Sequence, residues 1–493
     1  MTAPILFAPV ANGMSLPWLD VPEWPTAQFV AGTSAELNRG ARLCAWFGVP
    51  EGNTARLVAV LAYDADNTLA VARSTPFNGS YPSLTRTHPQ AHLFEREVWE
   101  QHALKPEGHP WLKPVRKSNG LAPAHADFFR VEGREIHEVA VGPVHAGVIE
   151  PGHFRFQCNG EEVLHLEIAL GYQHRGIEEA LPGGPHPATM SQMETIAGDT
   201  SIGHATSYAM VMEALAGTEA PLRAQWLRAI ALELERLANH TGDLGALAND
   251  VAFLPTSSAC GKLRGDFLNL TGLMCGNRFG RGLVRPGGAR HDLEPARSGA
   301  FLEKLHPALK DVEQAAAWLW DSNSVRVRFE ATGTVHTERA NAIGLVGVAA
   351  RASGLVRDVR FDHPAGWHRF AQSPVAVWPT GDVFARAKVR GLEIQRSGVF
   401  LEEQLAGAPE GVIHSELPAP APDTLAVALV EGWRGEICHV ALTDAAGRFR
   451  RYKICDPSFH NWTGLALALR GQAISDFPLC NKSFNLSYCG FDL

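Results

Sequence analysis

The sequence predicts an α+β protein, with a small N-terminal α/β domain followed by a large, mainly helical domain that holds a small β-sheet. Three observations predict this class. Strand-like segments dominate residues 1–115, apolar and polar residues alternate again soon after residue 134, and later stretches carry apolar residues at helical spacing. At 493 residues the chain is too long for one ordinary domain.

The N-terminal part is predicted to combine strands and a helix. "ARLVAVLAYD" and "TLAVARSTP" read as strands, with residues 64–67 as the turn between them. "FEREVWEQHAL" (Phe94–Leu104) reads as a short helix, and a stretch rich in Pro, Gly and Lys follows it. We therefore predict a first domain over 1–115, a linker over 116–133 and a second domain over 134–493.

The second domain is predicted to start as a hairpin or small sheet, with a turn at Asn159–Gly160. Helices are predicted at 193–217, 220–247, 299–321 and 381–405 from the spacing of their apolar residues, and Pro221 lies near a helix start. A final β-like segment covers 436–456.

The composition limits the classes of function. A content of 45% hydrophobic and 19% charged residues is typical of a globular protein, and the net charge of -8 without a basic tract argues against nucleic acid as a partner. The eight cysteines form no C-x-x-C pair, which argues against a zinc ribbon or a self-contained iron–sulfur motif, and they fit a reducing compartment. We expect neither a signal peptide nor a membrane-spanning segment.

Three stretches carry candidate functional residues. "GPVHAGVIEPGHFRF" places His145, Glu150 and His153 in a Gly/Pro-rich loop, which fits a metal site, a proton relay or simply a polar loop. Glu150 is flanked by Ile149 and Pro151, so we expect partial burial and a raised pKa suited to proton transfer.

The second stretch, "METIAGDTSIGHATSYAMVMEALAG", holds Asp199 and His204 among small residues, which fits either a close approach to the helix backbone or tight helix packing. The third, "EGWRGE", holds Arg434 just before a strand, where an arginine points either into a cleft or into solvent. "GNRFGRG" follows a helix and not a strand, so it fails the context of a dinucleotide-binding loop.

These stretches together resemble a known family. "GPVHAGVIEPGHFRF", "RAQWLRAIALELERLANHTGDLGAL", "GDVFARAKVRGLEIQRS" and "EGWRGE" are similar to the large subunit of membrane-bound, energy-converting (group 4, formate-hydrogenlyase-type) [NiFe] hydrogenases and to the 49-kDa-type subunit of complex I. The similarity runs from Arg134 to the C-terminus. The N-terminal part resembles the 30-kDa-type subunit of complex I through "HLFEREVWEQHALKPEGHPWLKPVR". The resemblance implies a hydrogenase-large-subunit-like second domain.

The metal ligands of the hydrogenases are missing. Their nickel is held by four thiolates from two C-x-x-C pairs, and soft sulfur ligands are what nickel needs in this role. In this chain Ala197, Thr200, Ser487 and Gly490 replace the nickel cysteines. We therefore predict no metal site in this chain.

The resemblance also implies roles for the retained residues. Glu150 and His153 match an E-x-G-H element whose glutamate serves the proton path, and Arg434 matches an arginine that overhangs the active-site cavity. In complex I the vacated cavity binds quinone through a histidine and a tyrosine, at whose places Ile149 and Gly198 stand here.

A quinone-like molecule in this chain would therefore need other polar contacts, from His145, Asp199 or His204, with His153 as a further candidate. Glu150, His153 and Arg434 are the predicted catalytic residues.

Two hypotheses follow. In the first, the chain is the large subunit of a proton-translocating, NADH:quinone-oxidoreductase- or hydrogenase-related complex. It binds no cofactor of its own except a quinone-like acceptor, and it packs against a small iron–sulfur subunit and antiporter-like membrane subunits, peripherally at the cytoplasmic face of the inner membrane. Any NAD chemistry belongs to other subunits. In the second, the chain is a redox-inert scaffold of an ion-transporting complex.

Overall fold

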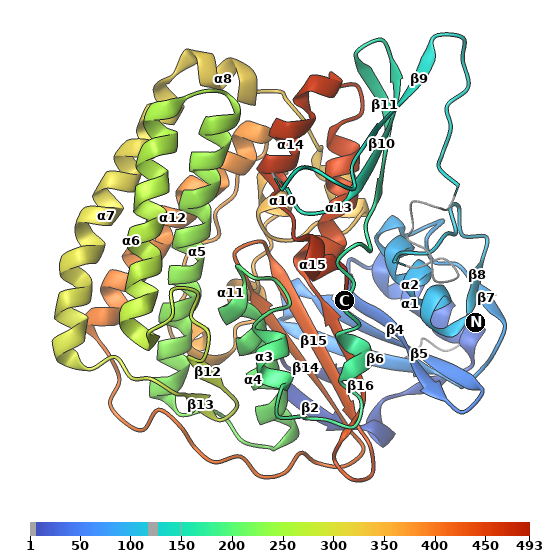
Figure 1. The fold of residues 1–493 in the computed structure, drawn as a ribbon. Helices are drawn as coiled ribbons and strands as arrows, with labels where there is room; N and C mark the ends of the chain where they lie inside the picture. Colours follow the sequence, from blue (N-terminus) through green and yellow to red (C-terminus); the bar gives the residue numbers. More distant parts are fainter. Residues whose placement is uncertain (1–5, 117–126, 148) are drawn as a thin grey trace.

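The computed structural model describes residues 6–116, 127–147 and 149–493, so residues 117–126 of the predicted linker lie outside it. A bundle of long helices lies on one side, an antiparallel sheet in the middle and a second sheet on the other side (Figure 1). This arrangement confirms the predicted α+β class.

The N-terminal sheet has the strand order β1-β6-β5-β4, and β3 pairs in parallel with β6. Its strands are β1 Ala8–Val10, β3 Glu23–Trp24, β4 Arg42–Glu51, β5 Thr54–Tyr63 and β6 Thr68–Ser74. Helices α1 (Thr26–Asn38) and α2 (His92–His102) accompany it, so the predicted helix is confirmed with a start two residues earlier. The predicted turn is a 3₁₀ segment over Asp64–Asp66, followed by Asn67 in the left-handed region at φ 50°.

The central sheet joins the two ends of the chain. Its order is β16-β15-β14-β2, in which β2 (Met14–Pro17) comes from the N-terminus and pairs antiparallel with β14 (Thr424–Glu431). The other two strands are β15 Glu436–Thr443 and β16 Phe449–Cys455. The predicted division at 115 and 134 stays a prediction, but the N-terminal part and the central sheet share this strand pairing.

Buried ion pairs reinforce that junction. Arg42 on β4 pairs with Glu436 on β15 at 2.8 Å, and Lys453 on β16 pairs with Glu97 on α2 at 2.6 Å. All four side chains are buried. A buried charge without its partner is costly, so these pairs fix how the N-terminal sheet lies on the central one.

The bundle consists of α5 Leu222–Asp250, α6 Leu254–Cys275, α7 Pro295–Asp321 and α12 Val383–Ala406. Helix α5 packs against α6 and α12, and α6 packs against α7. Helix α5 begins directly after Pro221, as predicted. Gly245 allows the close approach of α5 and α6, because a Cβ there would lie 2.8 Å from the Cβ of Cys260. Within the described residues no helix has the length and apolar character of a membrane span.

The predicted helix at 193–217 is interrupted. Helix α3 covers Thr189–Met193, α4 covers Ser201–Leu215, and residues 194–200 between them are not helical. In the gap, the Ser201 hydroxyl donates to the Glu194 carbonyl, and the Trp433 indole donates to the Asp199 carbonyl. Side chains therefore donate hydrogen bonds to carbonyls that would accept from backbone N–H groups in a continuous helix. The sequence pattern did not reveal these side-chain contacts.

The hairpin sheet carries the loop that holds Glu150. It consists of β9 Ile136–Val141, β10 His153–Asn159 and β11 Glu162–Ala169, in the order β11-β10-β9, and the predicted turn at Asn159–Gly160 is confirmed. The loop between β9 and β10 points back toward the C-terminal helices α13 Pro457–Ala468, α14 Phe477–Phe484 and α15 Tyr488–Phe491 (Figure 1).

Candidate functional site

Arg434 lies in a tight turn between β14 and β15. Gly435 in this turn has φ 141°, and a Cβ there would lie 2.7 Å from the backbone of Gly347. The turn therefore packs directly on another backbone, which only glycine permits. Arg434 is buried, so of the two predicted alternatives it does not point into solvent.

Arg434 forms a bidentate ion pair with Asp199. Its two terminal nitrogens lie 2.6 and 2.8 Å from the two carboxylate oxygens, and its guanidinium stacks on the Trp433 ring at 3.9 Å. Paired bonds of this kind fix geometry as well as charge. Burial alone would raise the pKa of Asp199, but the Arg434 charge outweighs it and holds that pKa below its ordinary value.

Thr200 completes this contact. Its hydroxyl donates to Asp199 at 3.1 Å and accepts from the Trp433 indole at 3.1 Å and from Arg434 at 3.2 Å. One of the predicted nickel-ligand positions is thus occupied by a hydroxyl that is fully engaged in hydrogen bonds.

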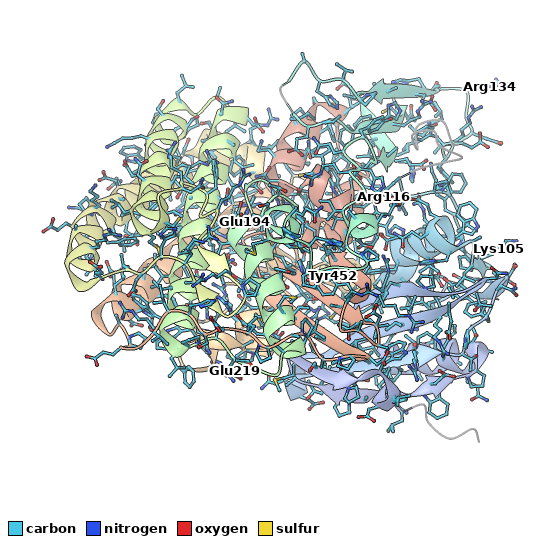
Figure 2. All side chains as sticks on the ribbon, turned by 60° about the horizontal axis from the view of Figure 1, so that its bottom comes forward. Lys105, Arg116, Arg134, Glu194, Glu219 and Tyr452 are labelled. Carbon is cyan, nitrogen blue, oxygen red and sulfur yellow. The ribbon has the colours of Figure 1, made fainter. Side chains whose placement is uncertain are left out.

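A buried hydrogen-bonded chain runs from Asp456 through two histidines to Tyr452. The His204 Nε2 lies 3.0 Å from the Asp456 carboxylate, its Nδ1 lies 3.1 Å from His439 Nε2, and His439 Nδ1 lies 2.9 Å from the Tyr452 hydroxyl. Tyr452, on β16, lies in the interior of the molecule (Figure 2).

The groups at the two ends of this hydrogen-bonded series determine which of its atoms carry protons. Because the Asp456 carboxylate accepts, His204 donates from Nε2 and accepts from His439, which in turn accepts from Tyr452. Burial and the neighbouring His204 ring lower the pKa of His439 well below its ordinary value, so this ring is neutral. Burial opposes ionisation of Asp456, but the hydrogen bond from His204 and the charge of Arg434 outweigh burial and lower the pKa of Asp456.

The two loop histidines hold the loop itself. The His145 Nε2 lies 2.8 Å from the Gly152 carbonyl, and the His153 Nδ1 lies 3.1 Å from the Gly142 carbonyl. A carbonyl only accepts, so both rings donate from these atoms. Burial lowers the pKa of His153, which favours its neutral form.

Glu150 as a whole residue is exposed, but its carboxyl is desolvated enough to raise its pKa, as predicted. Its pKa is raised by desolvation, against the opposing attraction of Arg434 and backbone hydrogen bonds from Tyr488 and Cys489, while the charge of Asp199 raises it further. The charges of Asp199 and Arg434 therefore act on Glu150, and the two histidines hold together the ends of the loop that carries it.

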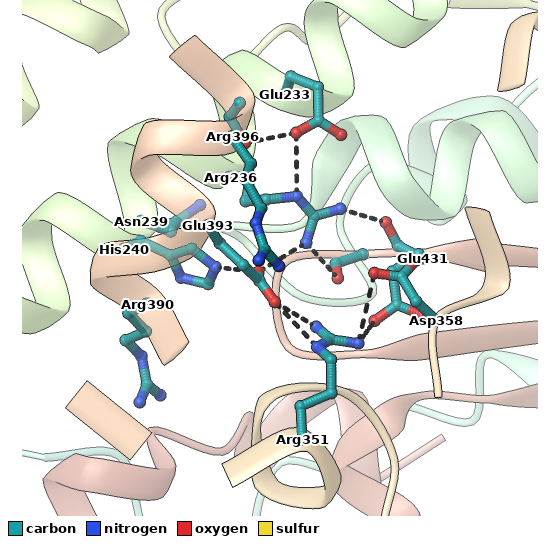
Figure 3. Close-up of polar contacts among 12 residues, drawn as sticks. Glu233, Arg236, Asn239, His240, Arg351, Asp358, Arg390, Glu393, Arg396 and Glu431 are labelled. Carbon is teal, nitrogen blue, oxygen red and sulfur yellow. Dashed lines mark hydrogen bonds and ion pairs between the residues drawn. The ribbon is translucent and has the colours of Figure 1, made fainter. Parts of the chain in front are cut away.

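A buried ionic network fixes the turn that carries Arg434 (Figure 3). Arg351 donates from Nε to Glu393 at 2.9 Å and from Nη1 to Glu431 at 2.7 Å, and Glu393 also lies 2.7 Å from His240. Arg236 donates to the backbone carbonyls of residues 431 and 432, directly before the Arg434 turn. The network joins α5, α12 and the end of β14, and so it sets where Arg434 lies.

Sequence reasoning did not select several of these residues. Asp456 carries a readable signal, because an aspartate directly before Pro457 is typical of a helix N-cap, and its side chain accepts from the Ser458 N–H. His439 on the buried strand β15 and the members of the ionic network gave no local signal.

Glu235 fixes the start of α4. Its carboxylate accepts from the N–H groups of Ile202 and Gly203 at 2.8 and 3.2 Å, and burial raises its pKa to about 8. The folded chain therefore binds a proton that the unfolded chain releases at lower pH, and this contribution to stability is lost as pH rises toward 8.

We predict that in Glu235→Gln the free energy of unfolding falls less steeply as pH rises, because the amide cannot ionise. The free energy of unfolding of the native sequence should fall by up to about 1.4 kcal/mol per pH unit from this group, measured by urea unfolding between about pH 5 and about pH 8. Glu161→Gln, at an exposed hairpin position, should keep the native slope. An equal slope in the Glu235 variant would contradict the raised pKa.

Comparison with known proteins identifies the family. The model of the respiratory-chain NADH dehydrogenase 49-kDa subunit matches residues 250–425, and the model of its 30-kDa subunit matches residues 25–129. A carbon monoxide-induced hydrogenase of Rhodospirillum rubrum is 31% identical over 353 residues, which cover 71% of this chain and 97% of the relative. The chain belongs to the large-subunit family shared by these hydrogenases and the NADH dehydrogenase.

Other similar proteins are named as subunits of different complexes. Formate hydrogenlyase subunit 5 of Escherichia coli (strain K12) is 29% identical over 83% of this chain and 76% of its own length. NADH-quinone oxidoreductase subunit 4 of Thermus thermophilus is 27% identical over 69% of this chain and 90% of its own length. The resemblance predicted from the motifs is thereby confirmed.

The residues present do not fit a nickel centre. A Cβ at Gly490 would lie 2.7 Å from the Asp456 carboxylate, so the space for a cysteine side chain there is filled. The Ser487 hydroxyl accepts the Gly490 N–H at 2.9 Å and caps α15. Ala197 is buried, and the Thr200 hydroxyl is engaged as described. Among the described residues no group of three or more His, Cys, Asp or Glu is arranged to hold a metal ion.

Proposed function

We propose that this family member is the large subunit of a membrane-associated, proton-translocating oxidoreductase complex that passes electrons to a quinone-like acceptor without a nickel centre. Relatives named as subunits of formate hydrogenlyase and of NADH-quinone oxidoreductase support this proposal. The iron–sulfur clusters would lie in a small partner subunit, antiporter-like subunits would form the membrane part, and this chain would lie peripherally at the cytoplasmic face.

The arrangement of carboxylates carries the proposal. Two carboxylates lie beside the predicted positions of the lost nickel thiolates. Asp199 is ion-paired with Arg434, and Asp456 is hydrogen-bonded to His204. A quinone takes up two protons with its two electrons. Exposed Glu150, with its raised pKa, would take a proton from water and release it inward, while Arg434 would hold negative charge that develops nearby.

The composition of the purified complex tests the redox part of the proposal. Nickel, iron and bound quinone would be determined per large subunit after purification in mild detergent. We expect iron and stoichiometric quinone without nickel. Stoichiometric nickel would overturn the argument from the filled Gly490 position.

Glu150→Gln tests the proton path. The clusters of the complex would be reduced chemically, the reductant removed, and their reoxidation by a soluble quinone analogue followed by absorbance. We expect Glu150→Gln to slow reoxidation at least about 10-fold, the lower end of what loss of a positioned proton donor costs, and to leave assembly intact. Glu161→Gln serves as the matched control, and a native rate in Glu150→Gln would remove Glu150 from the proton path.

The second candidate function is a redox-inert scaffold in an ion-transporting complex. The specific observation in its favour is that Arg434 is already neutralised by Asp199 and that Asp456 fills the space beside Gly490. The same experiments separate the two functions. A complex without redox metal and without bound quinone, whose activity does not depend on Glu150, would favour the scaffold.

A further inference from the structure

Asp199 shields the positive charge of Arg434 from solvent. Within residues 197–200, Gly198 and Asp199 reach the surface, and a Cβ at Gly198 would meet nothing within 4 Å. The Asp199 side chain keeps 33% of its surface exposed, whereas that of Arg434 keeps 6%. A molecule that approaches this ion pair from solvent therefore meets the carboxylate before the guanidinium.

Most N–H groups of Arg434 already have acceptors. The Nε group donates to the Asn485 carbonyl at 2.5 Å, the Nη1 group donates to both Asp199 and Thr200, and the Nη2 group donates to Asp199 at 2.8 Å. A guanidinium has five N–H groups, so a single N–H on Nη2 is left without an acceptor in the described part of the protein. A carboxylate, sulfate or phosphate binds arginine best through two parallel N–H groups, and no such pair is free here.

Carboxylates already balance the charge of Arg434. Burial disfavours its charged form, but Asp199, followed by Asp456 and Asp243, outweighs burial and raises the pKa of Arg434. Glu150 adds a further carboxylate at an exposed position, and the charge of Asp199 acts on it. An anionic ligand would bring more negative charge to a place where carboxylates outnumber the arginine, which is unfavourable.

The ion pair still offers an uncharged ligand one donor and one acceptor. The remaining N–H of Arg434 can donate to a carbonyl oxygen, and the exposed carboxylate of Asp199 can accept from a hydroxyl. The oxidised form of a quinone-like molecule carries carbonyl groups, and its reduced form carries hydroxyl groups. Both neutral forms therefore fit this pair, whereas an anion is repelled by Asp199.

We propose that Asp199 is a specificity-determining residue that restricts this site to uncharged oxygen ligands, because it occupies the face of Arg434 that would otherwise bind an anion. The inference rests on the proposed function where it names the charge class of the acceptor. The exclusion of anions by Asp199 does not require turnover, so it can be tested separately.

Formate tests whether Asp199 excludes anions. Asp199→Gly removes the carboxylate and leaves a space that formate fits, and formamide is the uncharged molecule of nearly the same shape. Binding of each to the purified complex would be measured by titration calorimetry at constant ionic strength. We expect Asp199→Gly to bind formate at least about 10-fold more tightly than the native complex does, and to prefer formate to formamide, because formate restores the lost charge-assisted hydrogen bonds. Equal formate affinity in the native and variant complexes would overturn the proposal.

Two further variants locate the bound anion. Arg175 is an exposed cation of the same region, whose Nη2 donates to the Ile196 carbonyl at 3.1 Å. Adding Arg175→Met to Asp199→Gly should leave formate binding unchanged, and loss of binding would overturn the proposal because the anion would then lie at Arg175. Asp199→Asn keeps the size of the side chain and one acceptor for Arg434, so it should assemble even where the glycine variant does not. It should also bind formate more tightly than the native complex, and native-like affinity would count against the proposal.

A matched pair of quinones tests the consequence for the acceptor. Reoxidation of the chemically reduced clusters would be followed with 1,4-naphthoquinone and with 1,4-naphthoquinone-2-sulfonate, which differ by one negative charge. We expect Asp199→Asn to shift the ratio of the two kcat/KM values at least about 10-fold toward the sulfonate, whereas Glu161→Gln keeps the native ratio. An unchanged ratio in Asp199→Asn would overturn the proposal. A native complex that reduces neither quinone would contradict the proposed function alone, and the formate measurement would still decide the role of Asp199.

Discussion

Arg351→Met is expected to destabilise the protein by about 3–5 kcal/mol, a large part of the about 5–15 kcal/mol that is typical of folded proteins. Arg351 has no exposed surface and is the shared partner of Glu393 and Glu431. Methionine fits the volume but leaves two buried carboxylates without this charge. The loss follows from the missing positive charge beside both carboxylates, although Glu393 keeps His240 and Arg236 as partners. The ion pairs themselves contribute much less net free energy.

The measurement is urea or thermal unfolding of the native chain and the variant at pH 7. Arg326→Met is the control, because Arg326 forms an ion pair with Glu330 at 2.7 Å but both side chains are largely exposed. Such a surface pair contributes roughly 0–1 kcal/mol. A loss below about 1 kcal/mol in Arg351→Met would show that the network is not what holds α12 and β14 together.

The sequence was informative where a local pattern decides the structure. Apolar spacing predicted the bundle helices α5, α7 and α12 but not α6, and the Gly/Asn turn predicted the β10–β11 hairpin, because these features depend on residues a few positions apart. The family motifs also selected Arg434 and Glu150 as catalytic residues, and this stays a prediction. These predictions needed no knowledge of distant partners.

The structural features that the sequence did not predict depend on contacts between residues far apart in the chain. Asp199 is withdrawn from a helix by Arg434 and Trp433, more than 230 positions later in the chain. Asp456 and His439 join His204 across a similar separation. Strand β2 pairs with β14 some 410 positions away, so the N-terminal part and the later sheet are built together. No periodicity or motif in a single sequence encodes which distant side chains will meet.

Gly490→Cys is expected to destabilise the protein strongly, because the space beside Gly490 is filled. A Cβ there would lie 2.7 Å from both Cγ and Oδ2 of Asp456, closer than real Cβ contacts. Asp456 cannot simply rotate away, because it accepts from His204 at 3.0 Å and from the Ser458 N–H at 2.7 Å. We expect a loss of about 2–4 kcal/mol, the sum of overpacking and a broken buried hydrogen bond.

The comparison variant is Gly261→Cys on α6, where a Cβ meets nothing within 4 Å and stability should be unchanged or slightly higher. Asp456→Ala should relieve the clash, so the double variant should be less destabilised than the sum of the two single changes, as measured by a double-mutant cycle in urea. A fully additive pair would mean that Asp456 does not occupy the cysteine space. Non-additivity would show that a carboxylate paired with His204 fills the place where a nickel thiolate is predicted to be lost, so that reintroducing the cysteines alone does not rebuild a metal site.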